Sequence, residues 1–129
     1  MKILFVYGSL MKNRSNSKYM KDAQYVGRAV IKDFSIYDLG FFPGIRQEKG
    51  KRVLGEVYRV NDEDFKKICE LEGEGLLYKL KKTKAFLKNK QVLRVNTFVY
   101  NGECERYAQE LDGRFLWNET DLTFLQNDR

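Results

Sequence analysis

The chain has 129 residues, of which 43% are hydrophobic and 14% aromatic, and its formal net charge is +6. This length and composition predict a single globular domain over residues 1–129 and exclude a disordered or fibrous protein. No apolar run approaches the roughly 20 residues of a membrane-spanning helix, and the opening run is shorter than the roughly 7–15 apolar residues of a signal peptide. We therefore expect a cytoplasmic protein with no membrane partner.

The absence of histidine restricts the chemistry that this chain can perform. It excludes Ser-His-Asp and Cys-His mechanisms and removes the commonest metal ligand. Cys69 and Cys104 are too few and too isolated to indicate a disulfide framework or a metal site. Any catalysis must use carboxylates, hydroxyls, thiols, lysines or backbone donors.

The first element is residues 3–7, which are aliphatic or aromatic throughout and predict a strand buried on both faces. Gly8 ends this run, and Ser9 and Leu10 follow without a second strand pattern. Backbone N–H groups left without ladder partners after such a strand can bind a carboxylate or phosphate, and a glycine leaves room for the ligand to approach. The alternative is that Gly8 only makes a turn after a core strand.

Between residues 11 and 60 the sequence predicts mostly extended structure. Ser17 is suited to cap a short helix that runs to Met20. Residues 38–45 contain the only proline, and they predict either an ordered, aromatic-lined loop or a turn that closes the core. Strand patterns in this region lie at residues 25–31, with a bulge or close approach at Gly27, at residues 34–37 and at residues 53–60.

The next element is a helix, which Asn61 or Asp62 is suited to cap. Acidic side chains follow in its first turn, where the helix dipole favours them. The apolar stripe expected to face the core is Phe65, Ile68 and Leu71, and Gly73 is the predicted end of the helix.

Three acids, Glu70, Glu72 and Glu74, lie at the C-terminal end of that helix. The helix dipole disfavours a negative charge there, and neighbouring carboxylates and partial burial act in the same direction. These effects would raise the pKa of Glu72 toward the range in which a general base works at neutral pH. The alternative, which we favour for Glu70 and Glu74, is that the acids are solvated and paired with nearby lysines.

Residues 76–86 and 92–100 flank a polar turn and predict a β-hairpin. Its lysines and the positive net charge are compatible with a nucleic-acid-binding module. The lysines of the first strand occupy both faces of the predicted ribbon, with Lys79 and Lys81 on one face and Lys82 and Lys84 on the other. Single-stranded nucleic acid is usually bound by basic and aromatic side chains on a shared face, so we expect a ribbon kept soluble by charge and no nucleic-acid partner.

Five short motifs follow one another along the chain. They are Val6-Tyr7-Gly8-Ser9-Leu10, Asp38-Leu39-Gly40 with Pro43-Gly44, Gly55-Glu56-Val57-Tyr58, Glu70-Leu71-Glu72-Gly73 with Tyr78, and Val99-Tyr100-Asn101-Gly102. In this order they resemble the gamma-glutamylcyclotransferase-like (AIG2-like) family, and the resemblance extends over roughly residues 2–117.

The resemblance implies an α+β fold, a small mixed β-barrel with flanking helices. It also implies a small-molecule gamma-glutamyl substrate that is cyclised to 5-oxoproline with release of an amine or amino acid. One glutamate of the family's acidic motif is the catalytic base, which corresponds here to Glu72. The first loop of the family binds the α-amino acid end, so the implied substrate-binding residues are Tyr7, Gly8, Ser9, Leu10 and Tyr78.

The implied reaction suits a chain without histidine. Cyclisation is intramolecular, because the substrate's own α-amine attacks its γ-carbonyl carbon. Such a reaction needs a base and a rigid seat but no protein nucleophile, metal or cofactor, so we expect none of these. Positioning alone can contribute about 7–11 kcal/mol. The sequence leaves two alternatives open: the fold could bind a small molecule without catalysis, and the amine side could be an amino acid, a lysine ε-amine or a small-molecule amine.

Overall fold

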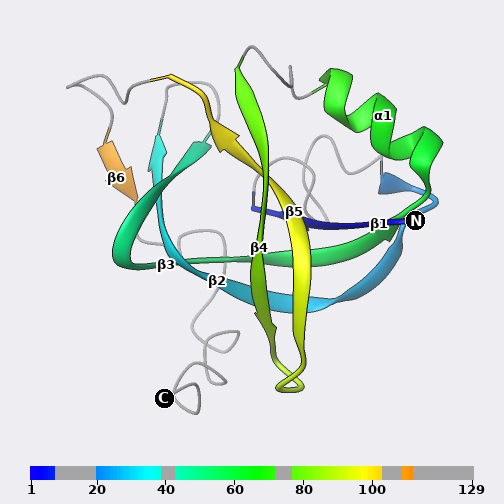
Figure 1. The fold of residues 1–129 in the computed structure, drawn as a ribbon, viewed down its shortest axis with the longest axis horizontal. Coiled ribbons are helices and arrows are strands. Elements are labelled where there is room, and N and C mark those ends of the chain that lie inside the picture. Colours follow the sequence, from blue (N-terminus) through cyan, green and yellow to red (C-terminus); the bar gives the residue numbers. More distant parts are fainter. Residues whose placement is uncertain (8–19, 39–42, 72–76, 103–108, 112–129) are drawn as a thin grey trace.

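A computed structural model describes residues 1–7, 20–38, 43–71, 77–102 and 109–111 of the chain. Most of these residues are in strands (Figure 1). In chain order the elements are β1 (Lys2–Val6), β2 (Gln24–Asp38), β3 (Pro43–Val60), α1 (Asp62–Leu71), β4 (Tyr78–Leu87), β5 (Val92–Tyr100) and β6 (Gln109–Leu111). The short helix predicted from Ser17 lies outside the described residues, apart from Met20.

Five of the strands close into a barrel. The order of the strands around the barrel wall is β3-β1-β5-β4-β2, and the pairing of β2 with β3 closes the ring. The sixth strand, β6, pairs with the end of β2. β1 is parallel to β5, and the other described pairs are antiparallel. This mixed barrel, with a helix packed against it, confirms the fold class expected from the sequence.

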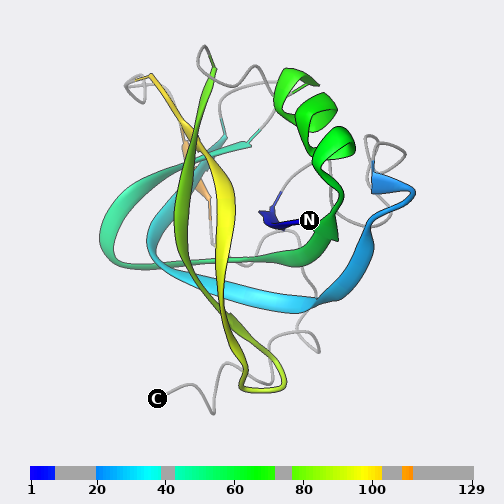
Figure 2. The same ribbon diagram turned by 45° about the vertical axis from the view of Figure 1, so that its right-hand side comes forward.

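The first strand is buried on both faces, as its sequence predicts. Phe5 belongs to the cluster that fills the barrel, to which all five wall strands contribute side chains. Leu4 and Val6 belong to a second cluster, between the barrel and α1, to which the helix contributes Phe65 and Ile68. Figure 2 shows α1 lying across the side of the barrel near β1. β1 therefore supports the barrel and the helix together.

The helix begins where its sequence predicts. The Asn61 side-chain oxygen accepts a hydrogen bond from the Asp64 N–H at 2.7 Å, and the Asn61 carbonyl accepts the first intrahelical bond, from the Phe65 N–H, at 2.9 Å. These two bonds identify Asn61 as the N-cap. The helix is described as far as Leu71, and the predicted end at Gly73 lies outside the described residues.

The strands predicted at residues 25–31, 34–37 and 53–60 all lie within observed strands, but the prediction that they are short and separate is wrong. β2 is continuous, and β3 begins at Pro43 within the predicted loop. The two strands pair along their length with register shifts after Tyr25 and after Lys32, the first of which is the bulge expected at Gly27. At the second shift Asp33 has a φ of 67°, and its carboxylate accepts the Gly50 N–H at 3.0 Å. Because backbone groups make the ladder, an exposed ribbon can continue through polar residues that show no apolar pattern.

The predicted hairpin is confirmed by β4 and β5, which pair from Tyr78 opposite Tyr100 to Phe86 opposite Val92. In the turn the Leu87 N–H donates to the Gln91 carbonyl oxygen at 2.9 Å. The strand β6 was not predicted from the sequence; it is three residues long and is defined by its pairing with β2. A strand this short shows no periodicity of its own.

Candidate functional site at one rim of the barrel

The topology gathers the ends of several elements at one rim of the barrel. β1 and β5 run parallel toward it, β4 starts there, and β2 passes into β3 there at the pair Asp38 and Pro43. These ends lie in the upper half of Figure 1, where α1 also ends. The segment after β1, with the predicted anion seat, and the segment after α1, with the predicted base, both begin at this rim.

Tyr7 follows β1 directly and is 6% exposed. Its ring belongs to the cluster inside the barrel, and its hydroxyl donates a hydrogen bond to the carbonyl oxygen of Phe98 on β5. This bond fixes the end of β1 against its parallel neighbour. Gly8, Ser9 and Leu10 come next in the chain and lie outside the described residues.

Tyr78 is the first residue of β4 and is 5% exposed. Its ring belongs to the cluster under α1 and contacts Phe98 and Tyr100 edge-on, at centroid distances of 6.4 and 6.3 Å. The Tyr78 hydroxyl donates to the carbonyl oxygen of Pro43 at 2.9 Å, which joins the start of β4 to the start of β3. The two tyrosines singled out by the sequence thus belong to different core clusters, and each holds one backbone segment of the rim.

The predicted base, Glu72, follows the last described residue of α1 and itself lies outside the described residues. Within α1 the first turn is acidic and the last turn contains no basic residue. No cation of its own last turn therefore offsets the negative end of the helix dipole. Glu70, which we expected to be a solvated acid, is exposed on that turn.

A buried carboxylate that the sequence analysis did not single out lies beside the end of β1. Glu56 is 7% exposed, pairs in register with Val6 of β1, and accepts a hydrogen bond from the Tyr58 hydroxyl at 3.1 Å. A buried acid is costly unless it is hydrogen-bonded or paired, so this arrangement is a built feature of the rim. The available signal was an acid placed between the apolar pair Val53 and Leu54 and the pair Val57 and Tyr58.

The described residues offer neither a metal site nor a membrane-spanning helix. No three His, Cys, Asp or Glu side chains among these residues are grouped closely enough to hold a metal ion. No helix within the same ranges has the length and apolar character needed to cross a bilayer.

Comparison with known proteins gives the same assignment as the motifs. The sequence profile of the family described as gamma-glutamyl cyclotransferase, AIG2-like, matches residues 4–118. The Methanocaldococcus jannaschii protein MJ1514, whose name places it among the gamma-glutamylcyclotransferases, is 30% identical over 106 residues, which cover 81% of this chain and 88% of that protein.

Two further proteins show how far the similarity extends. A Niallia circulans protein named gamma-L-glutamyl-butirosin B gamma-glutamyl cyclotransferase is 43% identical over 70 residues, which are 54% of this chain and 44% of that protein. An AIG2-like protein from Mus musculus has the same fold, with a TM-score of 0.75 over 83% of this chain and 82% of its own, at 21% identity. The chain therefore belongs to the gamma-glutamyl cyclotransferase, AIG2-like family.

Proposed function

We propose that this protein is a gamma-glutamyl cyclotransferase that converts a small gamma-glutamyl compound to 5-oxoproline and a free amine or amino acid. Glu72 acts first as the general base and then as the general acid. Backbone N–H groups of Gly8, Ser9 and Leu10 hold the α-carboxylate of the substrate. Tyr7 and Tyr78 fix the walls of the site through the backbone segments that their hydroxyls hold.

The reaction balances without a co-reactant. The α-amine nitrogen of the substrate attacks its own γ-carbonyl carbon, and the new carbon–nitrogen bond closes the lactam ring. Glu72 takes the proton that this nitrogen loses, the bond from the γ-carbonyl carbon to the leaving amine breaks, and Glu72 returns the proton to the leaving nitrogen. The products contain all the atoms of the substrate, so the proposed step consumes neither water nor an oxidant, and it requires no cofactor.

The observation that supports this proposal most directly is the convergence of β1 and α1 on one rim. Both elements pack into the same cluster, through Leu4 and Val6 from the strand and Ile68 from the helix. An intramolecular cyclisation needs its base and its substrate seat in fixed relation, since positioning can contribute about 7–11 kcal/mol. A strand and a helix that share a core are suited to hold two such segments.

The test is the release of 5-oxoproline from a panel of gamma-glutamyl compounds, measured by mass spectrometry. Wild type should release it from at least one compound, and Glu72→Gln should turn over about 10²–10⁴-fold more slowly, the usual share of a positioned proton-transfer group. Glu70→Gln is the matched control, because it removes the same charge two positions earlier and should change turnover only modestly.

Two results would contradict two different parts of the proposal, the identity of the base and the presence of catalysis. Unchanged turnover in Glu72→Gln would show that another group is the base. No release of 5-oxoproline by wild type from any compound, together with measurable binding of one of them, would identify a binding protein on this fold.

A further inference from the structure

Two lysines of β4 project from the inner face of the barrel wall. In the β4–β5 ladder Lys79 lies opposite Val99 and Lys81 opposite Thr97, and opposite residues in such a ladder share a face. Val99 belongs to the cluster inside the barrel, and Thr97 is fully buried, with its hydroxyl donating to the Phe5 carbonyl oxygen at 3.3 Å. Lys79 and Lys81 therefore stand on the core-facing side of β4.

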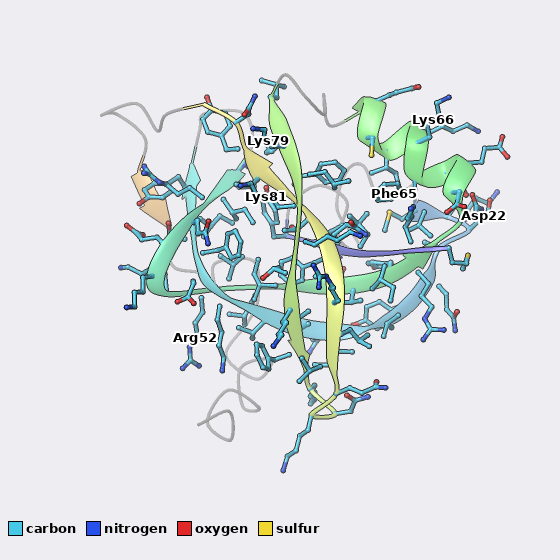
Figure 3. The ribbon with its side chains drawn as sticks, viewed as in Figure 1. Asp22, Arg52, Phe65, Lys66, Lys79 and Lys81 are labelled. Carbon is cyan, nitrogen blue, oxygen red and sulfur yellow. The ribbon has the colours of Figure 1, made fainter. Side chains whose placement is uncertain are left out.

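Both lysines are nevertheless exposed to solvent. The described pairing gives the reason: β4 pairs with β2 only from Ala85 to Leu87, and nearer the rim β2 pairs with β6 instead. Within the described strands, the part of β4 that carries Lys79 and Lys81 has a ladder partner on one side alone. Solvent thus reaches the inner face of the wall at this point. Figure 3 shows both side chains in the upper half of the molecule, beside the crossing of β4 and β5.

The two ammonium groups have no acidic counterpart in the described part of the chain, where no ion pair or hydrogen bond involves either of them. Their Cα atoms are about 7 Å apart, because two residues of a strand span that distance. Two cations on one face, without an acidic partner among the described residues, attract an anion, and the wall behind them strengthens that attraction relative to open water. Lys82 and Lys84 of the same strand point to the opposite, outer side.

We propose that Lys79 and Lys81 bind a carboxylate on the amine side of the substrate, so that the enzyme prefers gamma-glutamyl amino acids to gamma-glutamyl derivatives of neutral or cationic amines. This inference rests on the proposed function. A gamma-glutamyl amino acid has two carboxylates, and the α-carboxylate of its glutamyl half is assigned to the segment after β1. The lysines are on β4, a different strand at the same rim. We therefore assign them to the carboxylate on the amine side.

The test compares gamma-glutamyl-alanine with gamma-glutamyl-alaninamide, in which a neutral carboxamide of nearly the same shape replaces the carboxylate on the amine side. Wild type should show a kcat/KM about tenfold higher for the acid, which is about 1.4 kcal/mol of discrimination. Lys79→Met/Lys81→Met should lose that preference, mostly through KM, and keep its kcat/KM for the amide. The control is Lys82→Met/Lys84→Met, which removes two charges from the same strand on the other face and should keep the preference.

Salt provides a second readout, since screening shortens the range of an exposed charge interaction. Raising the salt concentration should reduce the preference of wild type for the acid over the amide. The ratio of the two kcat/KM values in Lys79→Met/Lys81→Met should not change with salt. The inference is overturned if wild type treats the acid and the amide alike, or if both double variants lose the preference equally, which would indicate an effect of overall charge.

Failure of the proposed function would be seen separately, as an absence of 5-oxoproline from both compounds. In that case titration calorimetry with the same two compounds decides the matter. Tighter binding of the acid that depends on Lys79 and Lys81 supports the anion site, and equal binding or no binding overturns it. Thermal unfolding of each variant establishes that it folds.

Discussion

Replacing Gly55 by alanine tests whether the barrel needs β1 and β3 in close contact at the point where β1 approaches the rim. A Cβ on Gly55 would lie 2.2 Å from the carbonyl oxygen of Val6 and 2.6 Å from the nearest atom of the Phe5 ring. Both distances are far inside van der Waals contact, and a backbone oxygen cannot rotate away as the tip of a side chain can. β1 would have to move off β3 and carry the fully buried Phe5 with it.

The expected loss of stability follows from that displacement. Overpacking a well-packed core costs about 1–3 kcal/mol, and a clash with backbone belongs at the upper end, about 3 kcal/mol. For a chain of this size 1 kcal/mol corresponds to about 4 °C in Tm, so Gly55→Ala should unfold about 12 °C below wild type. Far-ultraviolet circular dichroism during heating measures this difference.

Gly50→Ala is the matched control. No atom lies within 4 Å of the Cβ that it would add, so its cost is limited to the strain of an alanine at a φ of 88°. That strain is about 1–2 kcal/mol. Gly55→Ala should therefore melt clearly below Gly50→Ala. The reasoning would be refuted if Gly55→Ala melted within about 2 °C of wild type, because a fall that small corresponds to less than 1 kcal/mol and hence to no displacement of β1.

Two further variants have simple expected outcomes. Asn61→Ala removes the cap of α1 and should cost about 1 kcal/mol, seen as a fall in Tm of about 4 °C, and an unchanged Tm would mean that the cap contributes nothing. Replacing both Cys69 and Cys104 by alanine should leave turnover per folded molecule unchanged, because the chain has no histidine to activate a thiol, and a loss of turnover in a folded variant would reveal a thiol mechanism.

The parts of the fold that the sequence predicted are those set by local chemistry. An unbroken apolar run specified β1, an asparagine followed by acids specified the start of α1, and a polar turn between two β-rich runs specified the hairpin. The continuity of β2 and β3 was missed, since their exposed parts are held by backbone pairing and by the contact of Asp33 with Gly50. These features depend on residues distant in sequence, which a pattern along the chain does not reveal.

In the candidate site, too, the sequence predicted what local patterns determine and missed what depends on residues distant in sequence. Alternation along β4 correctly placed Lys79 and Lys81 on one face, but the sequence did not indicate which face looks into the barrel. That information comes from the register with Thr97 and Val99 of β5. The roles of Gly8, Ser9, Leu10 and Glu72 remain predictions, because these residues lie outside the described part of the chain. What the structure adds is the common rim from which both of their segments start.

The shared cluster under α1 has a consequence for the proposed catalysis. The proposed reaction requires a base held in fixed relation to the substrate seat, and positioning of reacting groups can contribute up to about 7–11 kcal/mol. In this protein the segment with the proposed base continues from α1 and the segment with the proposed seat continues from β1. Their relative position therefore depends on the cluster that Ile68 shares with Leu4 and Val6. Closely packed side chains resist such sliding, because a shift opens voids on one side and overlaps on the other. In the proposed mechanism, the hydrophobic layer beneath the helix therefore serves the chemistry as well as the stability of the fold.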